Sequence, residues 1–147
     1  MPTIAVVNGP NLNLLGTRET EIYGTTSIDD INEKLTSKAE ELGFDIEFFQ
    51  SNHEGALIDY IQGSIGRIQG LIINPGALTH YGYSLRDALA SINIPIIEVH
   101  ITNIFRREEW RSISLVTPLA AGSLMGLGGL GYDLALRAMV SFIEEKE

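Results

Sequence analysis

Cysteine is absent from this 147-residue chain, and lysine occurs only three times. Without cysteine there can be neither a disulfide nor a thiolate nucleophile, and a reducing compartment such as the cytoplasm is expected. Lys34 and Lys38 lie on an expected surface helix, and Lys146 stands beside the C-terminus. Because a Schiff-base lysine usually needs a desolvated position that lowers its pKa, imine chemistry is not expected.

Positive charge is scarce, since the formal net charge is −9 and only 10 residues are lysine or arginine. Nucleic acid is not an expected partner, because phosphate binding needs a cationic face. A small anion can still bind where a few cations are focused in one pocket. The first cationic side chain, Arg18, follows an apolar stretch, so a secretory signal is not expected either.

One long stretch lacks charge altogether. Residues 113–132 carry no charged side chain, and this is about the length of a membrane-spanning helix. The stretch nevertheless contains Pro118, five glycines and several hydroxyl residues. Its low apolar density favours a buried or subunit-facing segment, and no membrane partner is expected.

Strand and helix patterns alternate along the chain, whose 44% hydrophobic and 20% charged residues are ordinary for a globular protein. Strands are expected at residues 3–8, 44–49, 70–73, 95–101 and 112–116. Helices are expected from Ser27 to Gly43, after Ser51, at residues 84–92 and at residues 131–145. Ser27 with Asp30, and Ser51 with Glu54, have the spacing of capping boxes. The pattern predicts one α/β domain over residues 1–147: a five-stranded parallel sheet of flavodoxin-like order with helices on both faces.

Polar side chains gather where three of the expected strands end. They are Asn8, Asn11, Asn13, Arg18 and Tyr23 after the first strand, Asn74, Thr79 and His80 after the third, and His100, Thr102, Asn103, Arg106, Arg107 and Arg111 after the fourth. Ligands of such sheets bind beyond the carboxyl ends of the strands, at the switch point between the first and third strands. The sequence therefore predicts a ligand site at this rim.

Two features of the rim suggest chemistry. Glu98 and His100 are two residues apart on one strand, so their side chains share a face, and a carboxylate beside an imidazole orients it and favours its protonated form. A purely structural pair is the alternative. Residues 9–24 are long for a connection between strand and helix, which is typical of a lid or of a solvated loop.

The glycine run at residues 126–131 matches G-x-G-x-x-G, the dinucleotide fingerprint, but stands in the wrong place. That motif follows a first strand inside a βαβ unit, whereas this one precedes the last expected helix. We interpret these glycines as close-packing positions, against this chain or another subunit. His53 stands at a helix start without a companion and is interpreted as structural. No metal site is expected, because only His80 and His100 lie at the rim and ligand spacings are lacking.

Three segments resemble one family. They are residues 8–24 (NGPNLNLLGTRETEIYG), 73–89 (INPGALTHYGYSLRDAL) and 98–114 (EVHITNIFRREEWRSIS), which resemble the motifs of type II 3-dehydroquinate dehydratases. Residues 126–139 (GLGGLGYDLALRAM) are similar to the last helix of that family. The resemblance implies a flavodoxin-like fold and the cofactor-free anti elimination of water from 3-dehydroquinate through an enolate, on the shikimate pathway.

The resemblance also implies catalytic roles. Tyr23 matches the base that removes the proton at C2, and Arg18 matches the arginine whose charge that tyrosine needs. His100 matches the general acid for the departing C1 hydroxyl, with Glu98 supporting its charge. Asn11 matches the residue that positions a water near the enolate oxygen.

Further residues match binding positions of the family. The backbone of Ile101 and the backbone and hydroxyl of Thr102 match the carboxylate site. Asn74, His80 and Arg111 match the residues that bind the ring hydroxyls of the substrate. Asp87 matches a residue that reaches the site of a neighbouring subunit, and the family assembles as trimers grouped into dodecamers. Alternatively or in addition, Asp87 is the N3 residue after Ser84 and a candidate helix cap. Thr102, Phe105 and Arg106 depart from the usual family residues without removing a reactive group.

Two other functions stay open at this point. A non-catalytic flavodoxin-like module could bind a small anion or a protein, although it would not need a base, a cation and an acid together. A nucleotide or flavin protein could use the glycine run. A phosphorelay receiver is disfavoured, since the first and third strands end in asparagine rather than aspartate.

Overall fold

The structure is a computed structural model that describes residues 1–17, 21 and 25–146. Five strands form one parallel sheet in the order β2-β1-β3-β4-β5. They are β1 (Thr3–Asn8), β2 (Asp45–Gln50), β3 (Gly70–Asn74), β4 (Ile96–His100) and β5 (Gly122–Met125). The α-helices are α2 (Ile28–Leu42), α3 (Glu54–Gly63), α4 (Leu78–Tyr81), α5 (Tyr83–Ala90) and α6 (Leu130–Glu145). Short 3-10 helices are η1 (Leu12–Leu14), η2 (Ile104–Arg106), η3 (Glu109–Ser112) and η4 (Thr117–Leu119).

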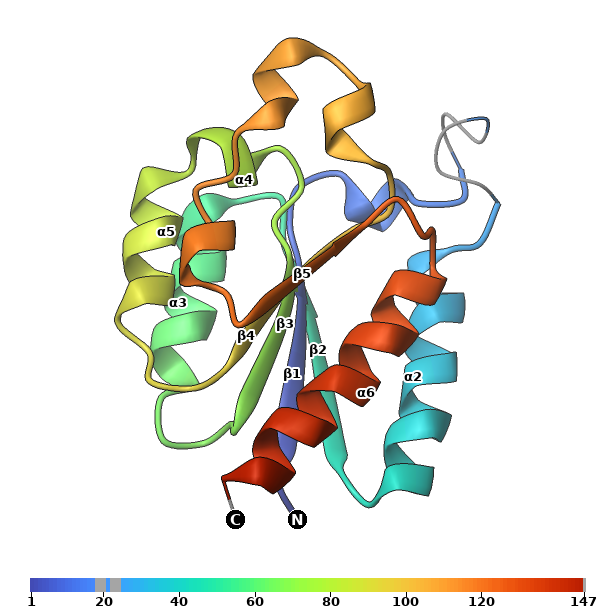
Figure 1. Ribbon diagram of the computed structural model, residues 1–147, viewed down its shortest axis with the longest axis vertical. Helices are drawn as coiled ribbons and strands as arrows, with labels where there is room; N and C mark the ends of the chain where they lie inside the picture. Colours follow the sequence, from blue (N-terminus) through green and yellow to red (C-terminus); the bar gives the residue numbers. More distant parts are fainter. Residues whose placement is uncertain (18–20, 22–24, 147) are drawn as a thin grey trace.

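The helices cover both faces of the sheet, with α2 and α6 on one side and α3, α4 and α5 on the other (Figure 1). This confirms the predicted α/β class and the flavodoxin-like order. Both chain ends lie at the amino end of the strands, and η2 and η3 rise above their carboxyl end (Figure 1). Within the described residues, every helix is too short or too polar to cross a bilayer.

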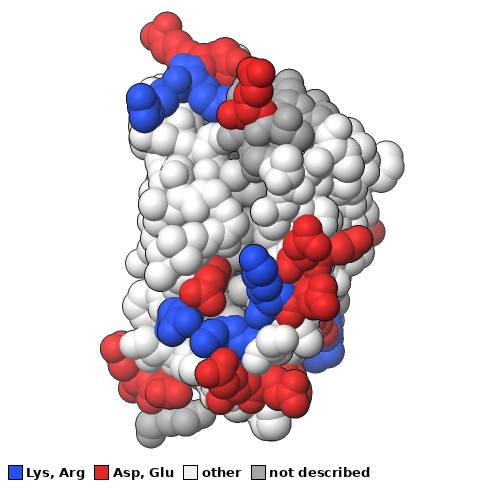
Figure 2. Space-filling model, turned by 90° about the vertical axis from the view of Figure 1, so that its right-hand side faces the viewer, with Lys and Arg blue, Asp and Glu red and all other residues white. Residues whose placement is uncertain are grey.

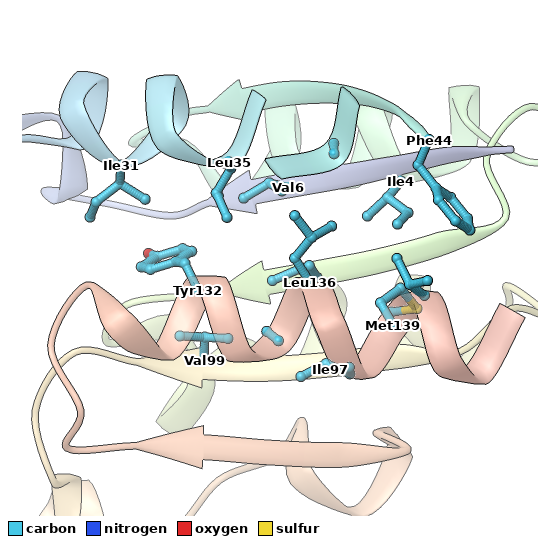
Figure 3. Close-up of a cluster of buried hydrophobic side chains, with 14 of the residues drawn as sticks. Ile4, Val6, Ile31, Leu35, Phe44, Ile97, Val99, Tyr132, Leu136 and Met139 are labelled. Atoms are coloured by element: carbon cyan, nitrogen blue, oxygen red, sulfur yellow. The ribbon is translucent and has the colours of Figure 1, made fainter. Parts of the chain in front are cut away.

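Alternation along β1 produces the two halves of the core. Ile4 and Val6 pack with α2 and α6, whereas Ala5 and Val7 face the side of α3 and α5, and all four are fully buried. Figure 3 shows the first half, where Tyr132 of α6 lies beside β1 with its ring among aliphatic side chains. A strand buried on both faces is typical of a parallel sheet.

The ends of α2 follow the local sequence signals. Ser27 Oγ accepts from the Asp30 N–H at 3.1 Å, and Asp30 Oδ2 accepts from the Ser27 N–H at 3.1 Å, so the predicted capping box is confirmed. Gly43 ends the helix at a φ of 82°, a left-handed conformation that glycine adopts without strain.

The predicted fifth strand at residues 112–116 was wrong, because β5 begins at Gly122. Ser112 instead ends η3, and Ser114 Oγ accepts from the N–H groups of Val116 and Thr117. The alternation of serine with apolar residues resembles a strand. The hydroxyl of Ser114 is used instead to bend the chain toward the Glu98 carboxylate, which lies 2.9 Å away.

Two predicted helix caps were also wrong. His53 and Gly82 precede α3 and α5, and neither helix has a side-chain cap. Ser51 Oγ accepts from the N–H of His53, and Glu54 reaches the N–H of Leu85 on α5 instead of its own helix start.

The glycine run packs within the chain, as expected of close-packing positions. A Cβ on Gly126 would lie 3.2 Å from Asn103, and one on Gly131 would lie 3.4 Å from Val99. The run lies between β5 and α6, at the end of the chain, where no following strand completes a dinucleotide-binding unit.

Candidate active site

A pocket opens at the carboxyl ends of β1, β3 and β4, the rim predicted from the sequence. It is lined by Pro10, Asn11, Leu12, Leu14, Leu15, Asn74, Gly76, Ala77, His80, His100, Ile101, Thr102, Ile104, Arg107 and Arg111. Seven of these are predicted site residues: Asn11, Asn74, His80, His100, Ile101, Thr102 and Arg111. Residues far apart in the sequence meet here because parallel strands bring their carboxyl ends to one edge.

The chain leaves β1 through a tight approach to β3. The Gly9 N–H donates to the Asn74 carbonyl at 2.7 Å, and any Cβ on Gly9 would collide with the Pro75 carbonyl. Asn11 then adopts a left-handed conformation with a φ of 72°, which asparagine tolerates better than most residues. Its N–H donates to Asn52 Oδ1 at 2.9 Å. The backbone thus fixes where Asn11 enters the pocket.

Asn74 is held by a network that the sequence did not reveal. Its Nδ2 donates to the Tyr132 hydroxyl at 2.9 Å, and its Oδ1 accepts from the Gly76 N–H at 3.1 Å. The Tyr132 hydroxyl in turn donates to Asn8 Oδ1 at 2.6 Å. An amide nitrogen carries two protons, so one remains to be directed at a ligand in the pocket that Asn74 lines.

His100 has a buried carboxylate behind it. Its Nε2 lies 2.6 Å from Glu98 Oε2, and Glu98 is fully buried. Burial raises the pKa of Glu98, but hydrogen bonds from His100, Thr117 and Thr79 outweigh it and hold the pKa below the ordinary range. Since an ionised carboxylate only accepts, Nε2 carries the proton of that hydrogen bond, and Nδ1 is the nitrogen that can exchange a proton with a ligand.

His80 has a different environment. Its Nδ1 lies 2.5 Å from the Ile113 carbonyl, so this nitrogen is the protonated one. Burial lowers the pKa of His80, and positive charge on His100 and Arg111 lowers it further, which outweighs that hydrogen bond. His80 is therefore a neutral hydrogen-bonding group near neutral pH, whereas His100 has the negative charge of Glu98 beside it.

Two arginines line the pocket. Arg111 stacks over the Trp110 ring at 4.1 Å from its centroid and pairs with Glu108, and Trp110 also meets the His80 ring edge-on at 5.3 Å. Arg107, which the sequence analysis named without a role, lines the pocket as well. Figure 2 shows basic and acidic side chains mixed at the upper end and over the lower part of one face, with a nearly uncharged surface between them. The positive charge at the pocket comes from Arg107 and Arg111, and a few cations focused in one place can attract an anion to an acidic chain.

Four predicted site residues do not line this pocket as the structure describes it. Glu98 lies fully buried behind His100, with its Oε2 2.6 Å from Nε2. Arg18 and Tyr23 lie outside the described residues. Asp87 lies on α5, where its exposed carboxylate meets Arg86 at 3.2 Å, and it does not line the pocket. Among the described residues, no group of three or more His, Asp or Glu side chains could hold a metal ion.

Comparison with known proteins gives a consistent result. A sequence profile described as dehydroquinase class II matches residues 2–140. The chain is 49% identical over 145 residues to the 3-dehydroquinate dehydratase of Halothermothrix orenii, covering 99% of this chain and 98% of that protein. It is 53% identical over 143 residues to the one of Endomicrobium trichonymphae, covering 97% and 100%.

Solved structures agree. The type II dehydroquinase of Butyrivibrio crossotus matches with a TM-score of 0.91 at 45% identity, covering 94% of this chain and 97% of that one. That of Propionibacterium acnes matches with a TM-score of 0.92 at 42% identity, covering 96% and 97%. With the strand-end pocket and its Glu98–His100 pair in the same chain, these matches show that the protein belongs to the class II dehydroquinase family.

Proposed function

We propose that the pocket is the catalytic site of this 3-dehydroquinate dehydratase, a hydro-lyase that converts 3-dehydroquinate to 3-dehydroshikimate. The observation that carries the proposal is the buried Glu98–His100 pair at the wall of a pocket that also holds two arginines and two asparagines. One catalytic domain over residues 1–147, acting in the cytoplasm without a cofactor, is part of the proposal.

The first half of the reaction is removal of the proton at C2. We assign the base to Tyr23 with Arg18 beside it, on the family resemblance, since both lie outside the described residues. The electron pair of the C–H bond is delocalised onto the neighbouring carbonyl oxygen to form an enolate. A water held by Asn11 stabilises the enolate oxygen. The fully buried Tyr132 is a poor alternative base, because burial raises its pKa.

The second half is departure of the C1 hydroxyl. The enolate electrons form the C1–C2 double bond while the C1–O bond breaks, and the leaving hydroxyl takes a proton to become water. We assign that proton to Nδ1 of His100, because Nε2 is committed to Glu98. His80 is the weaker candidate, since its lowered pKa leaves it neutral.

Substrate binding is assigned to the remaining pocket residues. The backbone of Ile101 and the backbone and hydroxyl of Thr102 receive the substrate carboxylate, and the arginine charges favour its entry. Asn74, His80 and Arg111 bind the ring hydroxyls, with Asn74 offering its second amide proton. These groups come from the end of β3, from α4, from the residues directly after β4 and from η3.

Asp87 is assigned to the pocket of a neighbouring subunit, in trimers that group into a dodecamer. Its exposed carboxylate on α5 supports this, as do the exposed rings of Tyr81 and Tyr83, at 58% and 67%, on the neighbouring turns. Light scattering of the purified chain tests the assembly, and Asp87→Asn should raise KM without dissociating it. A fully active monomer would contradict the assignment.

The reaction is tested by following the conjugated product of 3-dehydroquinate by absorbance. Turnover should survive a chelator and borohydride, because neither a metal nor an imine is involved. Tyr23→Phe and His100→Asn should abolish it, whereas Tyr60→Phe, which removes a phenol hydroxyl on α3, should not. A folded, assembled sample without turnover would contradict the proposal and favour a non-catalytic anion-binding module.

A further inference from the structure

Glu98 accepts hydrogen bonds from three hydroxyl groups as well as from His100. Thr79 Oγ1 lies 2.5 Å from Oε2, and Ser114 Oγ lies 2.9 and 3.0 Å from the two carboxylate oxygens. Thr117 Oγ1 donates to Oε1. The hydroxyls come from α4, from the segment after η3 and from the start of η4, so three separate elements converge on one buried carboxylate.

The direction of these hydrogen bonds follows from counting. Ser114 Oγ accepts from the N–H groups of Val116 and Thr117 at 3.1 and 3.0 Å, which occupies its two lone pairs. Its single proton is therefore left for Glu98 or for Thr79 Oγ1, which lies 2.9 Å from Ser114 Oγ. Thr79, Thr117 and His100 donate to Glu98, and Ser114 offers a fourth donor for the four lone-pair sites of a carboxylate. A protonated Glu98 would have to displace one of them.

We propose that Thr79, Ser114 and Thr117 are positioning residues of the dehydratase, which hold Glu98 as an oriented carboxylate and thereby fix the ring and charge of His100. None of the three lines the pocket. Their side-chain hydroxyls all reach Glu98, so their effect on the reaction is expected to pass through that carboxylate. The kinetic part of this inference rests on the proposed function, whereas the state of the Glu98 carboxyl can be measured without substrate.

The groups that can alter the charge around Glu98 are few. Among the described residues, they are His100 on the same strand and His80, which follows Thr79 and whose pKa is lowered by the charge of Arg111 and raised by that of Glu98. The hydroxyls do not titrate in the working range, so their contribution to holding Glu98 ionised is constant with pH. His100 can consequently give up a proton without Glu98 taking it.

Thr117→Val is the sharpest test, because the side chain is exposed and the substitution keeps its shape while removing one donor. The protonated carboxyl of Glu98 is followed by pH-difference infrared spectroscopy of the assembled protein, with Glu98→Gln identifying the band. The titration should move up by about one pH unit. Thr117→Ser should restore the wild-type midpoint. Thr36→Val, which removes a hydroxyl that donates to Asn32 on α2, is the matched control.

In the dehydration assay, Thr117→Val should lower kcat several-fold and leave KM within about twofold. The acidic limb of the plot of kcat against pH should move to higher pH by about the same amount as the infrared midpoint. The double variant Ser114→Ala/Thr117→Val should show larger effects. An unchanged infrared titration in Thr117→Val, or a raised KM with unchanged kcat, would overturn the proposal. Lack of turnover in the wild type would instead contradict the proposed function, and the infrared shift would still test the carboxylate assignment.

Discussion

Tyr132→Phe removes one oxygen atom from the centre of the protein and isolates two amides. The hydroxyl of Tyr132 is the donor to Asn8 Oδ1 and the acceptor of an Asn74 Nδ2 proton, and all three residues are at most 3% exposed. Burial raises the pKa of Tyr132, so the hydroxyl stays protonated and keeps its donor role. Phenylalanine fills the same space, so the change is one of hydrogen bonding rather than packing.

The magnitude follows from the two atoms left without their partner. Each unsatisfied buried polar atom costs about 1–3 kcal/mol. Asn8 and Asn74 are register partners on adjacent strands, so a direct amide–amide hydrogen bond can recover part of that loss. We expect the free energy of unfolding to fall by about 2 kcal/mol, which is a fall in Tm of roughly 4–8 °C for a chain of this size.

The same rearrangement should reach the pocket. If the Asn74 amide turns toward Asn8, its second proton no longer points to the place assigned to a substrate hydroxyl. KM should then rise by roughly tenfold, the effect of losing one hydrogen bond to a ligand, while kcat falls less. His100 and Glu98 are untouched by the substitution, since their hydrogen bonds involve other residues.

Urea unfolding monitored by circular dichroism, together with steady-state dehydration kinetics, measures both quantities. Tyr60→Phe is the matched control. The Tyr60 hydroxyl donates to Glu47 Oε1 at a distance of 2.5 Å, and neither residue lines the pocket. The control should leave KM unchanged. A Tyr132→Phe protein with wild-type stability and KM would refute the reasoning, since it would mean that the two amides do not depend on the hydroxyl.

Three further substitutions test other parts of the argument. Glu98→Gln should destabilise the fold near neutral pH, and by progressively less as the pH falls below about 4. A carboxylate with a lowered pKa stabilises the fold above its unfolded pKa and loses that contribution on protonation, which urea unfolding across pH measures. Gly9→Ala should cost more than about 2 kcal/mol and impair substrate binding, as its Cβ collides with the Pro75 carbonyl; unfolding and KM measure both effects. Leu35→Ala removes a buried side chain of α2 and should lower the free energy of unfolding in urea by about 2–5 kcal/mol. KM should not change, because Leu35 does not line the pocket.

Most of the sheet could be predicted because each strand and helix has its own local signal. Apolar runs predicted three strands and alternation at residues 44–49 predicted β2, all close to their observed bounds, and Ser27 and Gly43 marked the ends of α2. The fifth strand failed because local alternation at residues 112–116 is as strand-like as the Gly–Ser–Leu–Met of β5. What decides between them is the buried Glu98 carboxylate, a partner that no local window contains.

The pocket could be predicted in outline because the ends of parallel strands meet. That rule selected His80, His100 and Asn74 before any contact was known. It could not find the residues that hold them. Tyr132 reaches Asn74 from 58 positions away, and Thr117 reaches Glu98 from 19 positions away, with no periodic pattern linking either pair.

The two hidden networks reach the pocket from opposite faces of the sheet. Tyr132 lies among the side chains that α2 and α6 bury, whereas Glu98 points to the face of α4 and α5, where Thr79 meets it. Buried polar groups add little net stability over apolar packing of the same shape, and each is costly if any partner is missing. Their gain is geometric, because each network fixes the orientation of a side chain at the rim. Asn74 is thus left with one amide proton and His100 with its Nδ1 to direct at a ligand, and both side chains line the same pocket.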